Sequence, residues 1–132
     1  MLKKEVKILI CEDESIIAMD LKNTIKRLGY VVTSIVKTAD DLLKKTETEK
    51  PDIIISDIKL QGKSTSLNAL QSISANQKIP IIFLSGILNA PAITSGLSID
   101  PCYHITKPYV PGNLKDTIEK CISGKKTKSQ KK

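Results

Sequence analysis

Short apolar runs alternate along the chain with longer stretches in which apolar residues return every three or four positions. A short run rich in β-branched residues is typical of a strand covered on both faces, and the longer spacing is typical of an amphipathic helix. The pattern predicts five strands, at residues 6–11, 30–36, 53–56, 80–84 and 103–106.

The first two predicted helices have recognisable ends. Apolar residues recur at helical spacing from Ile16 to Leu28, and Gly29 then stops the helix. The second helix begins at Thr38, because Asp41 follows it with the spacing of a capping box, although that box prefers Glu or Gln at the fourth position. This helix should end before Pro51.

The remaining helices differ in strength. Apolar residues outline a third helix over 67–73, and a last helix should run from Pro111 to Gly124. Between them, residues 90–99 contain proline, glycine, serine and threonine, which oppose a firm helix. We expect this segment to be the weakest helix of the chain.

Strands that alternate with helices in this way predict an α/β fold. Right-handed crossovers are nearly obligatory, so the five strands should form one parallel sheet with helices on both faces. The natural strand order is 2-1-3-4-5, which gives a flavodoxin-like architecture. In such sheets ligands bind beyond the carboxyl ends of the strands.

The length of 132 residues suits a single domain. Its formal charge of +7 suggests nucleic-acid binding until the lysines are located. Five lysines follow Gly124, so the rest of the chain carries only +2 (7 − 5). We therefore divide the chain into a domain over residues 1–123 and a basic flexible tail over 124–132, and expect no specific DNA binding.

Cysteine usage and hydropathy indicate a reduced, cytoplasmic setting. Cys11, Cys102 and Cys121 are an odd number without CxxC spacing, and they lie within or beside apolar runs, which suits structural thiols. No apolar stretch approaches the ~18 residues that a membrane span requires. We expect a cytoplasmic protein that folds without disulfides.

Functional groups follow four of the predicted strands. Glu12 and Asp13 follow the first strand, Asp57 the third, Ser85 the fourth and Lys107 the fifth. Three carboxylates ~5 Å apart would repel by roughly 3 kcal/mol per pair at an effective dielectric near 20. A hard divalent cation offsets this repulsion, and Mg²⁺ fits best because it also accepts waters and a phosphate oxygen. The set predicts a site where Asp57 accepts a phosphoryl group.

Each of these residues also has a structural interpretation. Glu12 and Asp13 would stabilise the start of a helix through its dipole, and Asp57 or Ser85 alone would suit a turn. Their joint placement at strand ends favours chemistry instead. Asp57 would form an acyl phosphate, Lys107 would contact one phosphoryl oxygen, and Ser85 would donate a hydrogen bond to another.

The motifs CEDE, SDI, FLSG and TKPY, in this order, resemble the receiver domain of two-component response regulators over residues 6–123. The resemblance implies a CheY-like domain with Asp57 as phosphoacceptor and Glu12 and Asp13 as the acidic metal pair. It also implies a metal ligand from the backbone carbonyl of Lys59, a switch hydroxyl at Ser85 and a phosphate contact from Lys107. The implied donor is a histidine kinase or a phosphotransfer protein, and the receiver catalyses only its own phosphorylation and dephosphorylation.

The chain departs from this family at His104, where receivers usually have Tyr or Phe three residues before the lysine. Tyr103 could take part of the switch role, or His104 could move and add a pH dependence near its ordinary pKa of ~6.5. A partly exposed structural role for His104 is the alternative. The loop after Asp57 also lacks the glycine common before the third helix, so we expect this face to be mobile.

Other functions stay open. A haloacid dehalogenase-type hydrolase also uses a strand-end aspartate, but a second aspartate normally follows two residues later, where this chain has Lys59. A receiver-like binding module independent of phosphorylation is a further possibility. No helix-turn-helix follows residue 124, which favours a stand-alone receiver or a fragment of a hybrid sensor kinase. We expect an unidentified downstream protein partner, and homodimerisation stays open.

Overall fold

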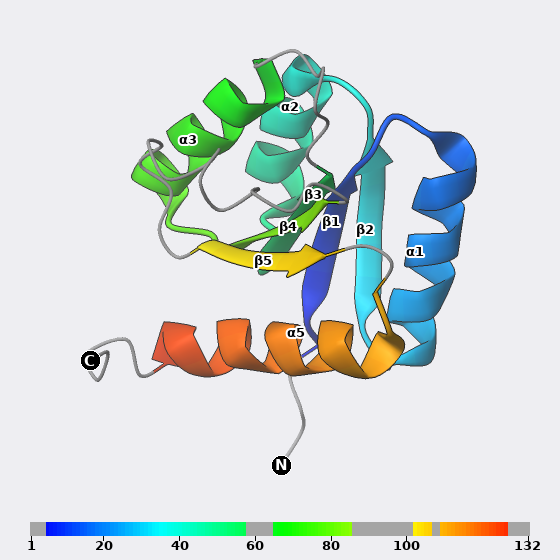
Figure 1. The fold of residues 1–132 in the computed structure, drawn as a ribbon. Helices are drawn as coiled ribbons and strands as arrows, with labels where there is room; N and C mark the ends of the chain where they lie inside the picture. Colours follow the sequence, from blue (N-terminus) through cyan, green and yellow to red (C-terminus); the bar gives the residue numbers. More distant parts are fainter. Residues whose placement is uncertain (1–4, 58–64, 86–101, 107–108, 127–132) are drawn as a thin grey trace.

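The computed structural model describes residues 5–57, 65–85, 102–106 and 109–126. Five strands form one parallel sheet in the order β2-β1-β3-β4-β5 (Figure 1), which confirms the predicted topology. Their bounds are β1 Lys7–Cys11, β2 Val31–Val36, β3 Ile53–Asp57, β4 Ile81–Ser85 and β5 Cys102–Thr106. β3 therefore occupies the centre of the sheet.

Within the described ranges, four helices cover the two faces of this sheet. They are α1 Ser15–Arg27, α2 Ala39–Glu49, α3 Thr65–Gln77 and α5 Pro111–Lys126. In Figure 1, α2 and α3 lie on one side of the sheet, and α1 and α5 lie on the other. The helix expected at residues 90–99 falls outside the described residues.

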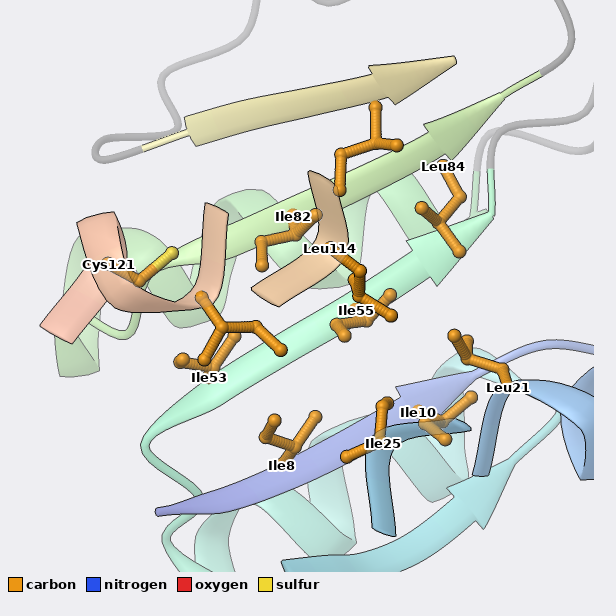
Figure 2. Close-up of a cluster of buried hydrophobic side chains, with 12 residues drawn as sticks. Ile8, Ile10, Leu21, Ile25, Ile53, Ile55, Ile82, Leu84, Leu114 and Cys121 are labelled. Carbon is orange, nitrogen blue, oxygen red and sulfur yellow. The ribbon is translucent and has the colours of Figure 1, made fainter. Parts of the chain in front are cut away.

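The sheet separates two apolar clusters. On one face, side chains of β1, β3 and β4 pack against Leu42 of α2 and against Leu70 and Ile73 of α3. On the other face, the alternate strand residues pack against α1 and α5, as Figure 2 shows. Because β1, β3 and β4 each contribute residues to both clusters, the near-continuous hydrophobicity of these strands is explained by burial on both sides.

Two local predictions from the sequence were wrong. Ile16 is 85% exposed, because Ala18, Leu21 and Ile25 form the buried stripe of α1. Ile16 precedes Leu21 by five residues and so points about 140° away from it. The second error concerns the last helix, which continues through Gly124 to Lys126. A glycine inside a helix costs only about 1 kcal/mol, so it does not end a helix by itself.

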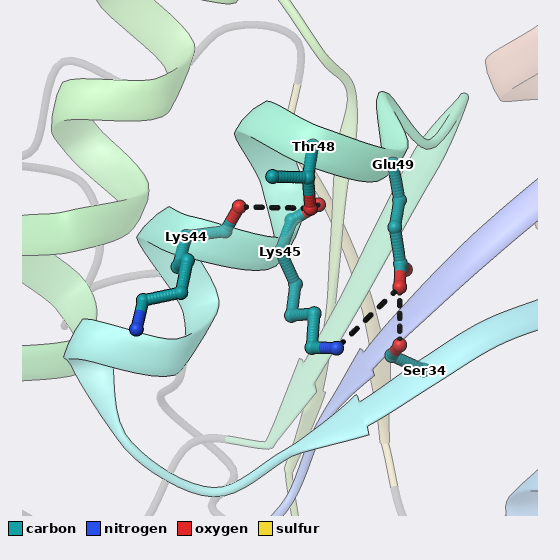
Figure 3. A network of polar contacts seen from close by, with 5 residues as sticks. All are labelled: Ser34, Lys44, Lys45, Thr48 and Glu49. Atoms are coloured by element: carbon teal, nitrogen blue, oxygen red, sulfur yellow. Dashed lines mark hydrogen bonds and ion pairs between the residues drawn. The ribbon is translucent and has the colours of Figure 1, made fainter.

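Polar contacts fix the start and the end of α2. Thr38 Oγ1 accepts a hydrogen bond from the backbone N–H of Asp41 at 3.1 Å, which confirms the predicted cap. At the other end, Ser34 Oγ of β2 donates to Glu49 Oε2 at 2.7 Å, and Lys45 forms an ion pair with the same oxygen (Figure 3). These contacts hold α2 against the edge strand of the sheet.

Cys11 and Cys121 are buried, one in each apolar cluster, as expected for structural cysteines. None of the helices within the described ranges is long and apolar enough to cross a membrane.

Candidate functional site

The carboxyl ends of the strands meet at one edge of the sheet. Cys11, the last residue of β1, is paired in register with Ser56 of β3, so Glu12 and Asp57 follow from neighbouring positions. Adjacent strands are about 4.8 Å apart. On the other side of β3, Asp57 is paired with Leu84, which directly precedes Ser85. The structure therefore brings together the ends of β1, β3 and β4, which the sequence had singled out.

Glu12 is almost fully buried, with 4% exposure. Its backbone N–H donates to the carbonyl of Val36 at 2.9 Å, which extends the pairing of β1 with β2. Its carboxylate Oε2 accepts the backbone N–H of Glu14 at 2.9 Å, immediately before α1 begins. One oxygen of Glu12 thus orients the turn into α1 through a hydrogen bond. The sequence had suggested only that Glu12 and Asp13 stabilise the start of this helix through its dipole.

Asp57 and Asp13 differ in exposure. Asp57 is half-buried, and its Oδ1 is among the buried side-chain oxygens. Asp13 is exposed at the bend between β1 and α1. Of these two aspartates, Asp57 is therefore sheltered at the edge of the sheet, whereas Asp13 is open to solvent.

No group of three or more His, Cys, Asp or Glu side chains is arranged to hold a metal ion within the ranges that the structure describes. The donor chemistry still fits Mg²⁺, because this ion commonly uses one or two carboxylates and completes its shell with waters and phosphate oxygens. Asp13 and Asp57 supply two carboxylates. Lys59, whose carbonyl the family resemblance implies as a ligand, falls outside the described residues.

The other side of the site is formed by β4 and β5. The register pairs Ser85 with Thr106, the residue before Lys107. Lys107 itself lies outside the described residues, and the side chain of Ser85 is likewise not described. The places of Ser85 and Lys107 at this edge of the sheet are therefore inferred from the strand register and from the order of residues in the sequence.

His104 is half-buried on β5 and lies opposite Phe83 in register. The two rings are stacked, with their centroids 5.7 Å apart and an interplanar angle of 25°. Burial lowers the pKa of the imidazole below its ordinary value of 6.5. His104 is therefore neutral at neutral pH and is packed on Phe83.

Comparisons with known proteins agree with this geometry. The family model of the response regulator receiver domain matches residues 8–119. Phyllosphere-induced regulator PhyR of Methylorubrum extorquens is 31% identical over 87% of this chain and 43% of its own length. Transcriptional regulatory protein PdtaR of Mycobacterium tuberculosis is 25% identical over 89% of this chain and 57% of its own. The chain spans about half the length of these curated relatives.

Solved structures give the same result. The signal receiver domain of a modulated diguanylate cyclase from Desulfovibrio desulfuricans superimposes with a TM-score of 0.83, at 25% identity, over 95% of this chain and 99% of its own. Anti-anti-sigma factor PhyR from Bartonella quintana gives a TM-score of 0.78, at 28% identity, over 97% of this chain and 51% of its own.

Proposed function

Because the chain belongs to the response regulator receiver domains, we propose that it accepts a phosphoryl group on Asp57 from a histidine kinase or a phosphotransfer protein. The observation that supports this proposal is the half-buried carboxylate of Asp57 at the carboxyl end of the central strand. Phosphoryl transfer depends mainly on alignment and charge neutralisation, and a strand end holds its side chain in a fixed place.

In the proposed reaction, a carboxylate oxygen of Asp57 attacks phosphorus in line with the leaving nitrogen of a donor phosphohistidine. The new oxygen–phosphorus bond forms an acyl phosphate, while the nitrogen–phosphorus bond breaks and its electron pair returns to the donor imidazole. Mg²⁺, when bound, neutralises charge on the transferred group. Asp13, Asp57, Glu12 and the backbone carbonyl of Lys59 are the proposed ligands, and Glu12 also holds the turn through Glu14.

Two further residues act on the phosphorylated form in this proposal. Lys107 contacts one phosphoryl oxygen, and the hydroxyl of Ser85 donates to another. Charge-assisted hydrogen bonds contribute ~1.5–3 kcal/mol each, so the pair supplies ~3–6 kcal/mol. Reversing a 1:99 equilibrium takes ~5.5 kcal/mol, so both contacts are needed for a full switch. His104 would take part in the switch by moving away from the Phe83 ring on which it is stacked.

The decisive experiment is incubation with acetyl phosphate and Mg²⁺, followed by intact mass spectrometry. We expect the wild-type chain to gain the mass of one phosphoryl group, and D57N to gain none. Labelling of D57N at the wild-type rate, or an unlabelled wild type, would contradict the proposal. Omitting Mg²⁺ is the matched control for the role of the cation.

A phosphorylation-independent binding module is the second candidate. The observation that favours it is the Glu12 carboxylate, whose Oε2 already accepts the backbone N–H of Glu14 and so serves the turn into α1. In that case the partner would bind wild type and D57N equally, with or without acetyl phosphate. In either case we propose a protein as the downstream partner and no turnover of an external substrate.

A further inference from the structure

Lys37 is an exposed residue that directly follows β2, and the sequence had assigned no role to it. Its Nζ donates a hydrogen bond to Oγ of Ser15, the first residue of α1, at 2.9 Å. The two residues are 22 positions apart in the chain. Figure 1 shows the turn from β1 to α1 passing beside the end of β2, in agreement with this contact. The hydrogen bond therefore joins the end of β2 to the helix that follows β1.

The backbone of Lys37 is fixed on both sides. The carbonyl of Val36, the residue before it, accepts the backbone N–H of Glu12 at 2.9 Å. The residue after it, Thr38, caps α2 by accepting the backbone N–H of Asp41 at 3.1 Å. The lysine side chain therefore extends toward α1 from a backbone that has little freedom to shift.

Ser15 also lies on a fixed element. In the first turn of α1, the backbone N–H of Ala18 donates to the carbonyl of Glu14 at 2.9 Å. Ala18 and Leu21 are buried and hold this helix on the sheet. Because both partners belong to ordered elements, the hydrogen bond from Lys37 restrains the turn between β1 and α1 as well as the two side chains.

This turn, residues 12–14, contains Asp13, one of the proposed Mg²⁺ ligands. Oε2 of Glu12 accepts the backbone N–H of Glu14 at 2.9 Å and restrains the turn from the side of β1. Lys37 restrains it from the side of β2, because it holds Ser15, the residue that follows Glu14. Asp13 is exposed, so packing contributes little to its position and polar restraints on the turn matter more.

We infer that Lys37 is a positioning residue, which holds the turn from β1 to α1 through Ser15 and so keeps Asp13 in place for the cation. The inference rests on the proposed function, because it concerns the same acidic edge of the sheet. Mg²⁺ requires near-ideal octahedral geometry, and a ligand that is ordered in advance binds with a smaller loss of conformational freedom. Loss of the hydrogen bond should therefore weaken the binding of Mg²⁺.

The charge of Lys37 acts in the opposite direction from its hydrogen bond. The ammonium repels a divalent cation, so its removal alone would strengthen Mg²⁺ binding. Ser15→Ala removes the acceptor and keeps the ammonium, whereas Lys37→Met removes both, so the two variants separate the two effects. At an ionic strength of about 0.15 M the Debye length is about 8 Å, which keeps the repulsion between exposed charges small.

The first measurement is calorimetric titration of the full chain with Mg²⁺ at this ionic strength. From the usual worth of one exposed hydrogen bond to a charged group, we expect S15A and K37M each to weaken binding about twofold to fivefold. The double variant S15A/K37M should bind no more weakly than either single variant. Lys37→Arg, which can still donate to Ser15, should retain the wild-type affinity.

Lys115→Met is the matched control. Lys115 is also an exposed lysine, and its Nζ donates to Oε2 of Glu119 at 3.5 Å, but both residues lie on α5. K115M removes one charge and one hydrogen bond far from the turn in sequence, and should bind Mg²⁺ as tightly as the wild type. Urea unfolding of every variant verifies that the chains compared are folded.

The second measurement is amide hydrogen exchange of the chain without Mg²⁺, which a general loss of stability would change throughout the domain. S15A and K37M should speed exchange of the Glu14 and Ser15 amides, while the amides of β3 should exchange at the wild-type rate. K115M should leave exchange in the turn unchanged.

Tighter Mg²⁺ binding by K37M, with no effect of S15A, would show that the lysine acts through its charge and would overturn the inference. Unchanged affinity and unchanged exchange in both variants would overturn it as well. Both results would leave Asp57 as the proposed phosphoacceptor. A wild-type chain that binds Mg²⁺ but is not labelled by acetyl phosphate would overturn the proposed function instead.

Discussion

Two glycines of this chain should respond oppositely to the same substitution by alanine. Gly29 ends α1 with φ +100°, in the left-handed region that disfavours residues with a Cβ. Its N–H donates to the carbonyl of Lys26 at 3.0 Å, and the N–H of Tyr30 donates to that of Ile25 at 3.2 Å. This is the Schellman pattern, which requires the left-handed residue.

The magnitude follows from the backbone alone, because a Cβ at Gly29 would meet nothing within 4 Å. The left-handed conformation costs an L-residue roughly 1–2 kcal/mol, so Gly29→Ala should lower the free energy of unfolding by that amount. Gly112 lies in the first turn of α5, where a Cβ also meets nothing within 4 Å. Gly112→Ala should stabilise the protein by up to about 1 kcal/mol, through helix propensity.

Urea unfolding followed by circular dichroism measures both variants on one scale. We expect the two free energies of unfolding to differ by about 1–3 kcal/mol, with wild type between them. At the usual unfolding entropy per residue, 1 kcal/mol corresponds to about 4 °C in the melting temperature. If both variants were destabilised equally, the left-handed cap at Gly29 would not be the cause, and the reasoning would fail.

Three further outcomes are expected. Thr38→Ala removes the oxygen that accepts the N–H of Asp41, and should lower the free energy of unfolding by about 1 kcal/mol in a urea titration. Because burial lowers the pKa of His104 in the folded state, the unfolded chain binds a proton more readily than the folded chain. The wild-type protein should therefore lose stability as the pH falls below 6.5. Thermal melts between pH 8 and pH 5 should show that His104→Phe removes this loss. In calorimetric titration with Mg²⁺, Asp13→Asn should lower the affinity at least about tenfold, whereas Glu12→Gln, whose amide oxygen can still accept from the turn, should lower it less.

The order of the strands and the identity of most helices could be predicted from the sequence because they depend on periodicity. Strands that alternate with helices can be ordered in a parallel sheet in only a few ways, and the preference for right-handed crossovers reduces the number of possible orders further. The ends of helices were less predictable. Gly29 ends a helix and Gly124 does not, although both follow an amphipathic stretch. The difference is the left-handed conformation, with its two backbone hydrogen bonds, which composition alone does not reveal.

The site was predictable in position but not in detail. Asp57 was placed at a strand end, since the apolar run before it predicts a central strand. The hydrogen bond from the N–H of Glu14 to the carboxylate of Glu12 was not foreseen. Two adjacent acidic residues are equally compatible with metal ligands and with residues at the start of a helix, and the sequence alone does not distinguish the two roles.

The parallel sheet divides the apolar interior of this small domain into two compartments without a shared side chain. Substitutions in separate, non-contacting regions usually have additive effects on stability. One compartment can therefore be repacked, for example to remodel the surface formed by α2 and α3, while the other keeps the chain folded. The fold thus leaves room for its two outer faces to diversify independently during evolution.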